Sequence, residues 1–269
     1  MLKIYGVVGN PLGQSLSPVI QNAALKAAGL PGEYRVFELK PATFDGFMKD
    51  VRKNHIAGLT VTMPFKQAVI PCLDAIDSHA EKIGAVNTVE VTPTRLIGHN
   101  TDYVGAIRAL EEKTDLEGKR VLLLGFGGAA KAIAYGLHEK KVRLSVHTRV
   151  PREFKEFPSH FKITHVPFGK IRGSDYDVII NATPVGMAPD IGHTVLSAKQ
   201  IEGCPLVMDV VYKPRHTQFL HEAESVGAMT LPGDRMLLFQ GARQFEIWHH
   251  QPAPLEAMEK ALNEAIARY

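Results

Sequence analysis

Residues 120–130 read Arg-Val-Leu-Leu-Leu-Gly-Phe-Gly-Gly-Ala-Ala, an apolar strand that runs into a glycine-rich turn and a helix. Its last six residues fit the pattern Gly-x-Gly-x-x-Gly/Ala. The first glycine permits the tight turn, the second lets a pyrophosphate approach the backbone, and the small sixth residue lets helix and strand pack closely. The helix then offers unpaired N–H groups and a positive dipole end to phosphates. In this strand-turn-helix context the motif predicts a dinucleotide site rather than a ligand-free turn.

The residues after the next predicted strand, at residues 142–146, indicate which dinucleotide binds. A site for NAD places Asp or Glu about 20 residues after the glycine-rich turn, at the end of this strand, where the carboxylate accepts a hydrogen bond from the ribose 2′-hydroxyl. This chain has His-Thr-Arg-Val-Pro-Arg at residues 147–152, with no carboxylate. A guanidinium binds a 2′-phosphate by charge-assisted hydrogen bonds. Arg149 and Arg152 therefore predict NADP(H) over NAD(H), and solvated loop cations are the alternative interpretation.

Strand and helix signals alternate on both sides of this motif. Short apolar runs bounded by Gly and Pro alternate with segments of helical periodicity, which is typical of a mostly parallel α/β sheet. We expect strands at residues 4–9, 34–39, 58–62, 86–91, 120–124, 142–146, 178–181 and 206–210, and helices at residues 18–28, 43–53, 101–110, 131–138 and 236–267.

The length predicts two domains. The chain has 269 residues, and domains average roughly 150 residues. We expect an α/β domain formed by residues 1–103 and 238–269, with the C-terminal helix packing back on it. Residues 104–237 are expected to form a Rossmann-like dinucleotide-binding domain.

Composition excludes several classes of protein. Hydrophobic residues make up 45% and charged residues 22% of the chain, close to the globular average, so disorder is not expected. The net charge of +3 gives little support for nucleic-acid or membrane-surface binding and suits anionic small ligands. No apolar stretch reaches 18 residues, and Cys72 and Cys204 share no metal-ligand spacing. We therefore expect a cytoplasmic protein with two reduced thiols and no metal.

Two serines near the N-terminus are candidates for binding a carboxylate. Ser15 and Ser17 are separated by one residue, so in an extended segment their hydroxyls point the same way. They stand just before a predicted helix. The alternative is that Ser17 merely caps this helix, with Pro18 at its first position.

Three further polar residues stand close to the ends of predicted elements. Lys66 follows the strand that ends near Met63-Pro64, Asn87 belongs to residues 84–88, and Asp102 opens a predicted helix. Ligands of open α/β sheets bind outside the carboxyl ends of the strands. Each residue alone indicates little, because a single Lys or Asp is usually a solvated charge.

Eight motifs in the same order resemble those of the shikimate dehydrogenase family. They cover nearly the whole chain, at residues 15–18 (Ser-x-Ser-Pro), 61–66 (Val-Thr-Met-Pro-Phe-Lys), 84–88 (Gly-Ala-Val-Asn-Thr), 100–102 (Asn-Thr-Asp), 125–129 (Gly-x-Gly-Gly-Ala), 181–187 (Asn-Ala-Thr-Pro-x-Gly-Met), 209–214 (Asp-x-x-Tyr-x-Pro) and 233–241 (Gly through Gln-Gly).

The resemblance implies a two-domain α/β enzyme that reversibly reduces 3-dehydroshikimate to shikimate with NADPH, in aromatic amino-acid biosynthesis. It implies that Lys66 and Asp102 are the catalytic pair. The implied substrate contacts are Ser15, Ser17, Thr62, Asn87, Tyr212 and Gln240. The implied cofactor contacts are Gly125, Gly127, Gly128, Ala129, His147, Thr148, Arg149, Arg152, Asn181, Thr183 and Gly233.

One departure from the family pattern concerns the cofactor site. The family often carries Asn-Arg-Thr where this chain has His147-Thr148-Arg149, so the arginine stands one position later and Arg152 shares or replaces its role.

Other functions stay open at this point. One is a broader quinate/shikimate dehydrogenase that uses NAD. Another is a non-catalytic NADP-binding protein, and a third is a folate-intermediate dehydrogenase of related architecture. The expected state is a monomer or a homodimer.

Overall fold

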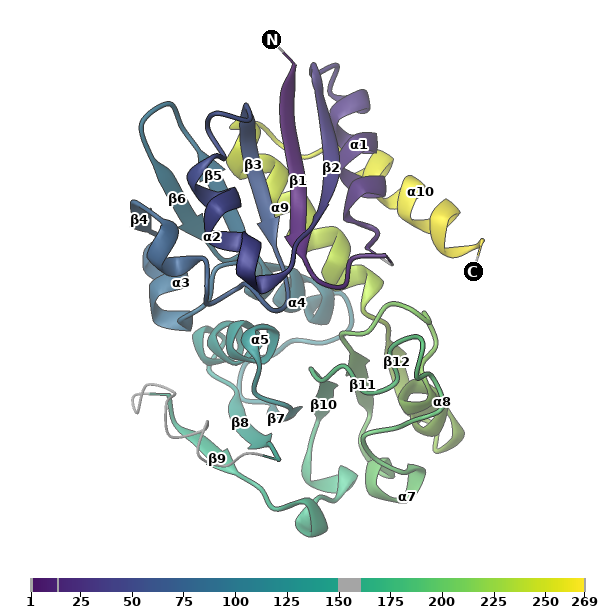
Figure 1. Cartoon of the computed structure of the whole chain (residues 1–269). Coiled ribbons are helices and arrows are strands. Elements are labelled where there is room, and N and C mark those ends of the chain that lie inside the picture. Colours follow the sequence, from purple (N-terminus) through teal and green to yellow (C-terminus); the bar gives the residue numbers. More distant parts are fainter. Residues whose placement is uncertain (1, 14, 150–160, 269) are drawn as a thin grey trace. The chain divides into compact units, whose positions relative to one another are not determined.

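The computed structural model describes residues 2–13, 15–149 and 161–268. The chain divides into two compact units (Figure 1). The first unit comprises Met1–Asp102 and Leu238–Tyr269, and the second comprises Tyr103–Leu237. Each unit is built on one six-stranded sheet. The α/β class expected from the sequence is thus confirmed.

The sheet of the first unit is only partly parallel. Its strands are β1 (Lys3–Gly9), β2 (Gly32–Glu38), β3 (Ile56–Val61), β4 (Ala75–Ile76), β5 (Thr88–Val91) and β6 (Leu96–His99), in the order β2-β1-β3-β5-β6-β4. Strand β1 pairs in parallel with β2 and β3, whereas β5 is antiparallel to both β3 and β6. The sequence reading missed β4 and β6, because each contains only two consecutive apolar residues, too short a run to indicate a strand.

The two faces of this sheet are covered by different helices. Leu59 and Val61 of β3 pack with Phe44 and Met48 of α2 (Pro41–Lys49). The alternate residue Gly58 lies against Trp248 of α9 (Asp234–His249), where a Cβ would come within 2.5 Å of the indole. This period of two is the ordinary alternation of a strand. One face therefore contacts an apolar core, and the other contacts α9.

The remaining helices of the first unit are α1 (Ser17–Ala27), α3 (Ser78–Ile83) and α10 (Leu255–Ile266), with α1 packed against α10. Gly29 ends the α1 segment with φ of +63°, as expected of a helix stop. The predicted helix over residues 236–267 is wrong as a single element. It is two helices, because Pro252 and Pro254 stand between α9 and α10 and a proline cannot continue a helix.

The second unit has a fully parallel sheet. Its strands are β7 (Arg120–Leu124), β8 (Arg143–His147), β9 (Ile163–His165), β10 (Val178–Asn181), β11 (Leu206–Asp209) and β12 (Met229–Leu231), in the order β12-β11-β10-β7-β8-β9. Every pairing is parallel. This is the strand order of dinucleotide-binding sheets, which reverses between the first and fourth strands. The reversal falls between β7 and β10.

The helices of the second unit include α4 (Asp102–Glu111), α5 (Gly128–Glu139), α7 (Ala198–Ile201) and α8 (Gln218–Ser225). One core cluster joins the sheet to α8 through residues such as Leu122, Val207 and Phe219, all almost fully buried. In the part of the chain that the structure describes, no helix is both long and apolar enough to span a bilayer. Cys72 and Cys204 are both free thiols, as expected.

Candidate active site

Lys66 and Asp102 form an ion pair at one edge of the first unit's sheet. The Lys66 Nζ donates to Asp102 Oδ2 at 2.6 Å, and the side chains are 17% and 8% exposed. Asp102 begins α4, where a carboxylate is favoured by the positive end of the helix dipole. Its backbone N–H donates to Asn100 Oδ1 at 3.0 Å. The pair is thus mostly removed from solvent and fixed at a helix start.

The antiparallel strand β5 explains why Asn87 lies beside this pair. Asn87 directly precedes β5, and Thr88 at the start of that strand pairs with Thr60 near the end of β3 and with His99 at the end of β6. The residues that follow β3, precede β5 and follow β6 therefore meet at the same edge. A β5 parallel to β3 would have carried Asn87 to the opposite edge.

Asn87 orients the carboxylate of Asp102. Its Nδ2 donates to Asp102 Oδ1 at 2.8 Å and to Thr101 Oγ1 at 3.0 Å. Its Oδ1 accepts from the Thr101 N–H at 2.7 Å and from the Thr88 hydroxyl at 2.8 Å. Both oxygens of Asp102 therefore have a donor, one from Lys66 and one from Asn87.

This network continues to Gln244 of α9, which the sequence reading missed. Gln244 Nε2 donates to Thr88 Oγ1 at 3.0 Å, and its Oε1 accepts from Thr60 Oγ1 at 2.8 Å. The hydroxyl of Tyr34 in turn donates to Thr60 at 2.6 Å. Gln244 is fully buried. Gln244 could have been predicted from its spacing, because it lies one helical turn after the candidate Gln240 and therefore on the same face of the helix.

Most of the remaining substrate candidates also lie in the first unit. Ser15 is half-buried and Ser17 is buried, and the Ser17 N–H donates to Ser15 Oγ at 3.4 Å. Helix α1 is capped by Leu16 without a side-chain hydrogen bond. The alternative that Ser17 merely caps the helix is therefore wrong, because Ser17 is already the first helical residue and Pro18 the second.

Thr62 and Gln240 complete the candidates in this unit. Thr62 is half-buried just beyond β3, and its N–H donates to the Val8 carbonyl at 2.9 Å. Gln240 is buried on α9. Tyr212 differs from all of these, because it belongs to the second unit, where it is half-buried beyond β11.

The glycine turn of the second unit has room for a phosphate. Gly127 caps α5 without a side-chain hydrogen bond, the first turn of α5 contains no acidic residue, and a Cβ built on Gly127 would meet nothing within 4 Å. Gly128 and Ala129 form the start of the helix. Gly125 has a φ of +98°, and a Cβ there would lie 2.8 Å from Thr183 Cγ2. An open helix N-terminus of this kind fits a pyrophosphate.

The other cofactor candidates lie at the ends of β8 and β10. At the end of β8, His147 Nδ1 lies 3.0 Å from the Val166 carbonyl, Thr148 is buried and Arg149 is exposed. Arg152 lies outside the described residues. Asn181 ends β10, opposite Leu124 of β7.

Asn181 shapes the turn after β10. Its Oδ1 accepts from the Thr183 N–H at 3.0 Å and from the Thr183 hydroxyl at 2.7 Å. Its Nδ2 donates to Asp209 Oδ1 at 3.0 Å. Gly233 also has a packing function, because a Cβ there would lie 2.3 Å from the Val210 carbonyl.

Asp209, which ends β11, is the centre of this second network. Its Oδ1 also accepts from the Val211 N–H at 3.0 Å, and its Oδ2 accepts from the Thr217 hydroxyl at 2.7 Å. Burial raises the pKa of Asp209 to about 7, although these hydrogen bonds oppose the change. The sequence reading placed Asp209 in a motif without giving it a function.

Comparison with known proteins identifies two matching family models. Residues 7–89 match the shikimate dehydrogenase substrate binding domain, and residues 235–262 match the shikimate 5′-dehydrogenase C-terminal domain. Neither match includes the glycine turn of the second unit.

Full-length relatives extend the similarity over the whole chain. The shikimate dehydrogenase (NADP(+)) of Geobacillus kaustophilus is 38% identical, with 100% of both chains covered. The shikimate 5-dehydrogenase of Thermus thermophilus, solved with NADP(H) and shikimate, is 35% identical with a TM-score of 0.91, and 98% and 100% of the chains are covered. The Listeria monocytogenes enzyme, solved with shikimate and NAD, is 32% identical with a TM-score of 0.87, and 97% and 96% are covered.

Proposed function

The chain belongs to the shikimate dehydrogenase family, and on that premise we propose that it catalyses the reversible NADPH-dependent reduction of 3-dehydroshikimate to shikimate. The observation that carries the proposal is the buried ion pair of Lys66 with Asp102, oriented by Asn87. A reduction of a ketone needs a proton donor held in place, and this pair supplies one.

Lys66 is proposed as the acid. NADPH, when bound, supplies the hydride to the ketone carbon. The Lys66 ammonium stabilises the negative charge that grows on the ketone oxygen and then donates a proton to it. In the reverse direction, neutral Lys66 accepts the proton of the hydroxyl. Asp102, held by Asn87, keeps the amine pointing in one direction.

The substrate carboxylate is assigned to the serine pair. Ser15 and Ser17 each offer a hydroxyl donor near the start of α1, where the dipole favours an anion. Thr62, Asn87, Gln240 and Tyr212 are the proposed contacts for the hydroxyl and ketone oxygens. Apart from Tyr212, the proposed substrate contacts belong to the first unit, as the substrate-binding family model for residues 7–89 supports, and we assign NADP binding to the second unit.

The cofactor is assigned to the start of α5 and the end of β8. The pyrophosphate would approach Gly127, Gly128 and Ala129, whose helix N-terminus is open. Arg149, with Arg152, is proposed to bind the 2′-phosphate, close to His147 and Thr148. Asn181, Thr183 and Gly233 are proposed as further cofactor contacts, and they also hold the neighbouring turns. A homodimer or monomer, and a cytoplasmic location, stay predictions.

Four parallel assays test the substrate and the cofactor together. Shikimate and quinate are each mixed with NADP⁺ and with NAD⁺, and absorbance of the reduced nicotinamide is followed. Fast reduction only with shikimate and NADP⁺ supports the proposal. Comparable turnover of quinate, or comparable turnover with NAD⁺, would favour the enzyme of broader specificity. This alternative is included because the Listeria relative was solved with NAD. No turnover in any assay would favour a non-catalytic binding protein.

A single variant tests the assignment of the 2′-phosphate. Arg149→Ala should weaken binding of NADPH by about 10–150-fold, the loss of a charge-assisted hydrogen bond, and leave NADH unchanged. The control is Arg143→Ala, an exposed arginine at the other end of β8. Equal losses for NADH and NADPH would refute the assignment.

A further inference from the structure

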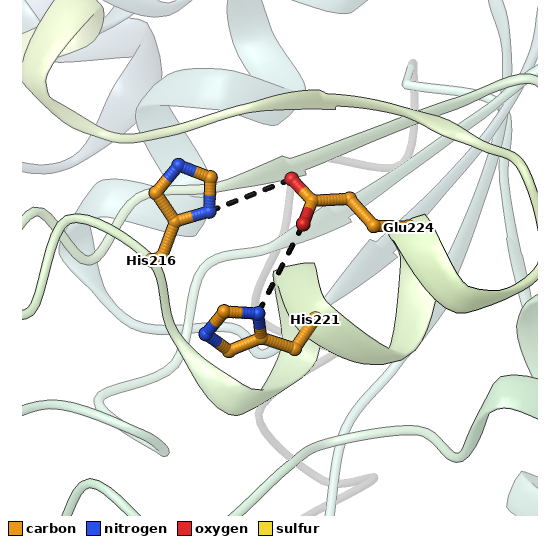
Figure 2. Close-up of side chains that lie close together, drawn as sticks. All are labelled: His216, His221 and Glu224. Atoms are coloured by element: carbon orange, nitrogen blue, oxygen red, sulfur yellow. Dashed lines mark ion pairs between the residues drawn. The ribbon is translucent and has the colours of Figure 1, made fainter.

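His216, His221 and Glu224 converge on the surface of the second unit, and none of them is among the residues assigned above (Figure 2). His216 directly precedes Thr217, the N-cap of α8, and the other two lie three residues apart on that helix. The His216 Nδ1 lies 3.4 Å from Glu224 Oε1, and the His221 Nδ1 lies 3.9 Å from Glu224 Oε2. Among residues 2–13, 15–149 and 161–268, no other three His, Cys, Asp or Glu side chains come together in this way.

The spacing of the three ligand atoms suits a metal ion. All three atoms lie within 4.8 Å of one another. Nitrogen and carboxylate ligands of zinc lie about 2.0–2.2 Å from the ion, so neighbouring ligands are roughly 3.3–3.5 Å apart in a tetrahedral shell. Small side-chain rotations would bring the three atoms to that separation. The imidazole rings are already side by side, with centroids 5.7 Å apart and planes tilted by 33°.

Two of the three positions are anchored to the interior. Thr217, next to His216, is fully buried and its hydroxyl donates to Asp209 at 2.7 Å. The Thr230 hydroxyl donates to Glu224 Oε1 at 2.9 Å, which fixes the carboxylate from the neighbouring strand β12. Helix α8 itself is held by buried Phe219, Leu220 and Ala223. The cluster is therefore a defined arrangement and not three independent surface side chains.

The site is open to solvent, and Arg215, the cation adjacent to His216 in the sequence, is already paired. The side chains of His216, His221 and Glu224 are 48%, 58% and 42% exposed, so an ion can enter and water can complete its shell. Arg215 forms an ion pair with Asp234 at 3.0 Å. Two imidazoles with one carboxylate favour borderline ions such as Zn²⁺ or Ni²⁺ over Mg²⁺ or Ca²⁺, which prefer oxygen ligands alone.

We propose that His216, His221 and Glu224 form a surface site for a borderline divalent cation, with Zn²⁺ as the fitting ion. An ion there would join the loop after β11 to α8. The proposal does not depend on the proposed enzymatic function, because it concerns a different set of side chains.

The test is zinc titration of the full chain, purified without a histidine tag and stripped of metal with a chelator. Calorimetry with ZnCl₂ should detect one site that MgCl₂ and CaCl₂ do not fill. His216→Ala and His221→Ala should each weaken that site about tenfold or more, since removing even an outer partner of a metal ligand costs about that much. Glu224→Gln keeps the shape and removes the charge, and it should weaken the site as well.

His193→Ala is the matched control. His193 is also exposed and contacts a carboxylate three residues away, Asp190 at 2.8 Å, but with no third ligand. Its zinc affinity should equal that of the unchanged chain. Equal zinc binding by the unchanged chain and the double variant H216A/H221A would overturn the proposal, and so would an equal loss in the control. An anomalous zinc peak between the three side chains in a soaked crystal would locate the ion directly.

Discussion

The two units each bury a polar network at the edge of their sheet, and the networks differ in charge. In the first unit, Asn87 joins neutral threonines and Gln244 to the charged pair of Lys66 and Asp102. In the second unit, Asp209 is the centre, and all its donors are neutral. The carboxylate of the first network therefore has a cation beside it, whereas that of the second has none.

This difference separates the proposed acid, Lys66, from a carboxyl group that links segments of the fold. Lys66 keeps 17% of its side chain exposed, so its amine can reach a ligand. Asp209 has no exposed surface, and burial raises its pKa to about 7. A buried charge is costly unless it is paired, and the unpaired acid responds by holding its proton. Asp209 thus serves to connect the segments after β10 and β11, and it does not face a substrate.

Removing the cation of the first network should have the largest effect. Lys66→Ala should lower kcat by about 10²–10⁴-fold, the usual contribution of a general acid, with a small change in KM. Steady-state kinetics with shikimate and NADP⁺ measures this, and Lys53→Ala, at a lysine 81% exposed, is the control. An unchanged kcat with a large rise in KM would make Lys66 a binding residue only.

Interrupting the neutral part of the first network should have a smaller effect. Gln244→Leu removes the acceptor of the buried Thr60 hydroxyl and one donor to the buried Thr88 hydroxyl, although Tyr34 still donates to Thr60 and Thr88 still donates to Asn87. We expect a loss of about 1–3 kcal/mol in the free energy of unfolding and a decrease of about tenfold in kcat, which corresponds to about 1.4 kcal/mol of transition-state stabilisation.

Denaturant unfolding and kinetics together check this prediction, with exposed Gln251→Leu as the control. Gln244→Glu keeps the shape and an acceptor for Thr60 but loses the amide donor to Thr88, so it separates the contribution of one hydrogen bond from that of the other. If Gln244→Leu loses stability but keeps its full kcat, Gln244 supports the fold without orienting Asp102.

The second network should be visible in the pH dependence of stability. Folded Asp209 holds its proton up to about pH 7, whereas in the unfolded chain it ionises near its usual 3.8. The folded state therefore binds more protons between these values, and the free energy of unfolding falls as pH rises, by up to about 1.4 kcal/mol per pH unit. Asp209→Asn should remove that contribution.

Urea unfolding of both proteins from pH 4.5 to 7.5 measures the difference. Asparagine can accept from Asn181 and Val211 and donate to Thr217, so the variant is expected to fold. The two stabilities should converge at the acid end, and the variant should be the more stable near neutral pH. A constant difference across the range would mean that Asp209 is ionised in the folded protein.

Local patterns predicted those elements for which a single segment contains all the information. The strand at residues 120–124, the glycine turn and the strand at residues 178–181 are as predicted. Gly125 has a positive φ and Gly127 leaves the helix start open, and both glycines belong to the same six-residue motif. Short elements without a continuous apolar run, such as β4, β6 and α3, were missed.

Only the tertiary structure decided which polar residues meet. The sequence by itself determined the α/β class, the glycine motif and the candidate residues Lys66, Asn87 and Asp102. It did not determine that β5 runs antiparallel, which brings Asn87 to the edge where Asp102 begins α4. Nor did it indicate Gln244, which lies 157 residues from Asn87 along the chain and contacts its carbonyl. The physical reason is that the direction of a strand and the packing position of a helix depend on the whole sheet. A local sequence pattern therefore does not indicate them.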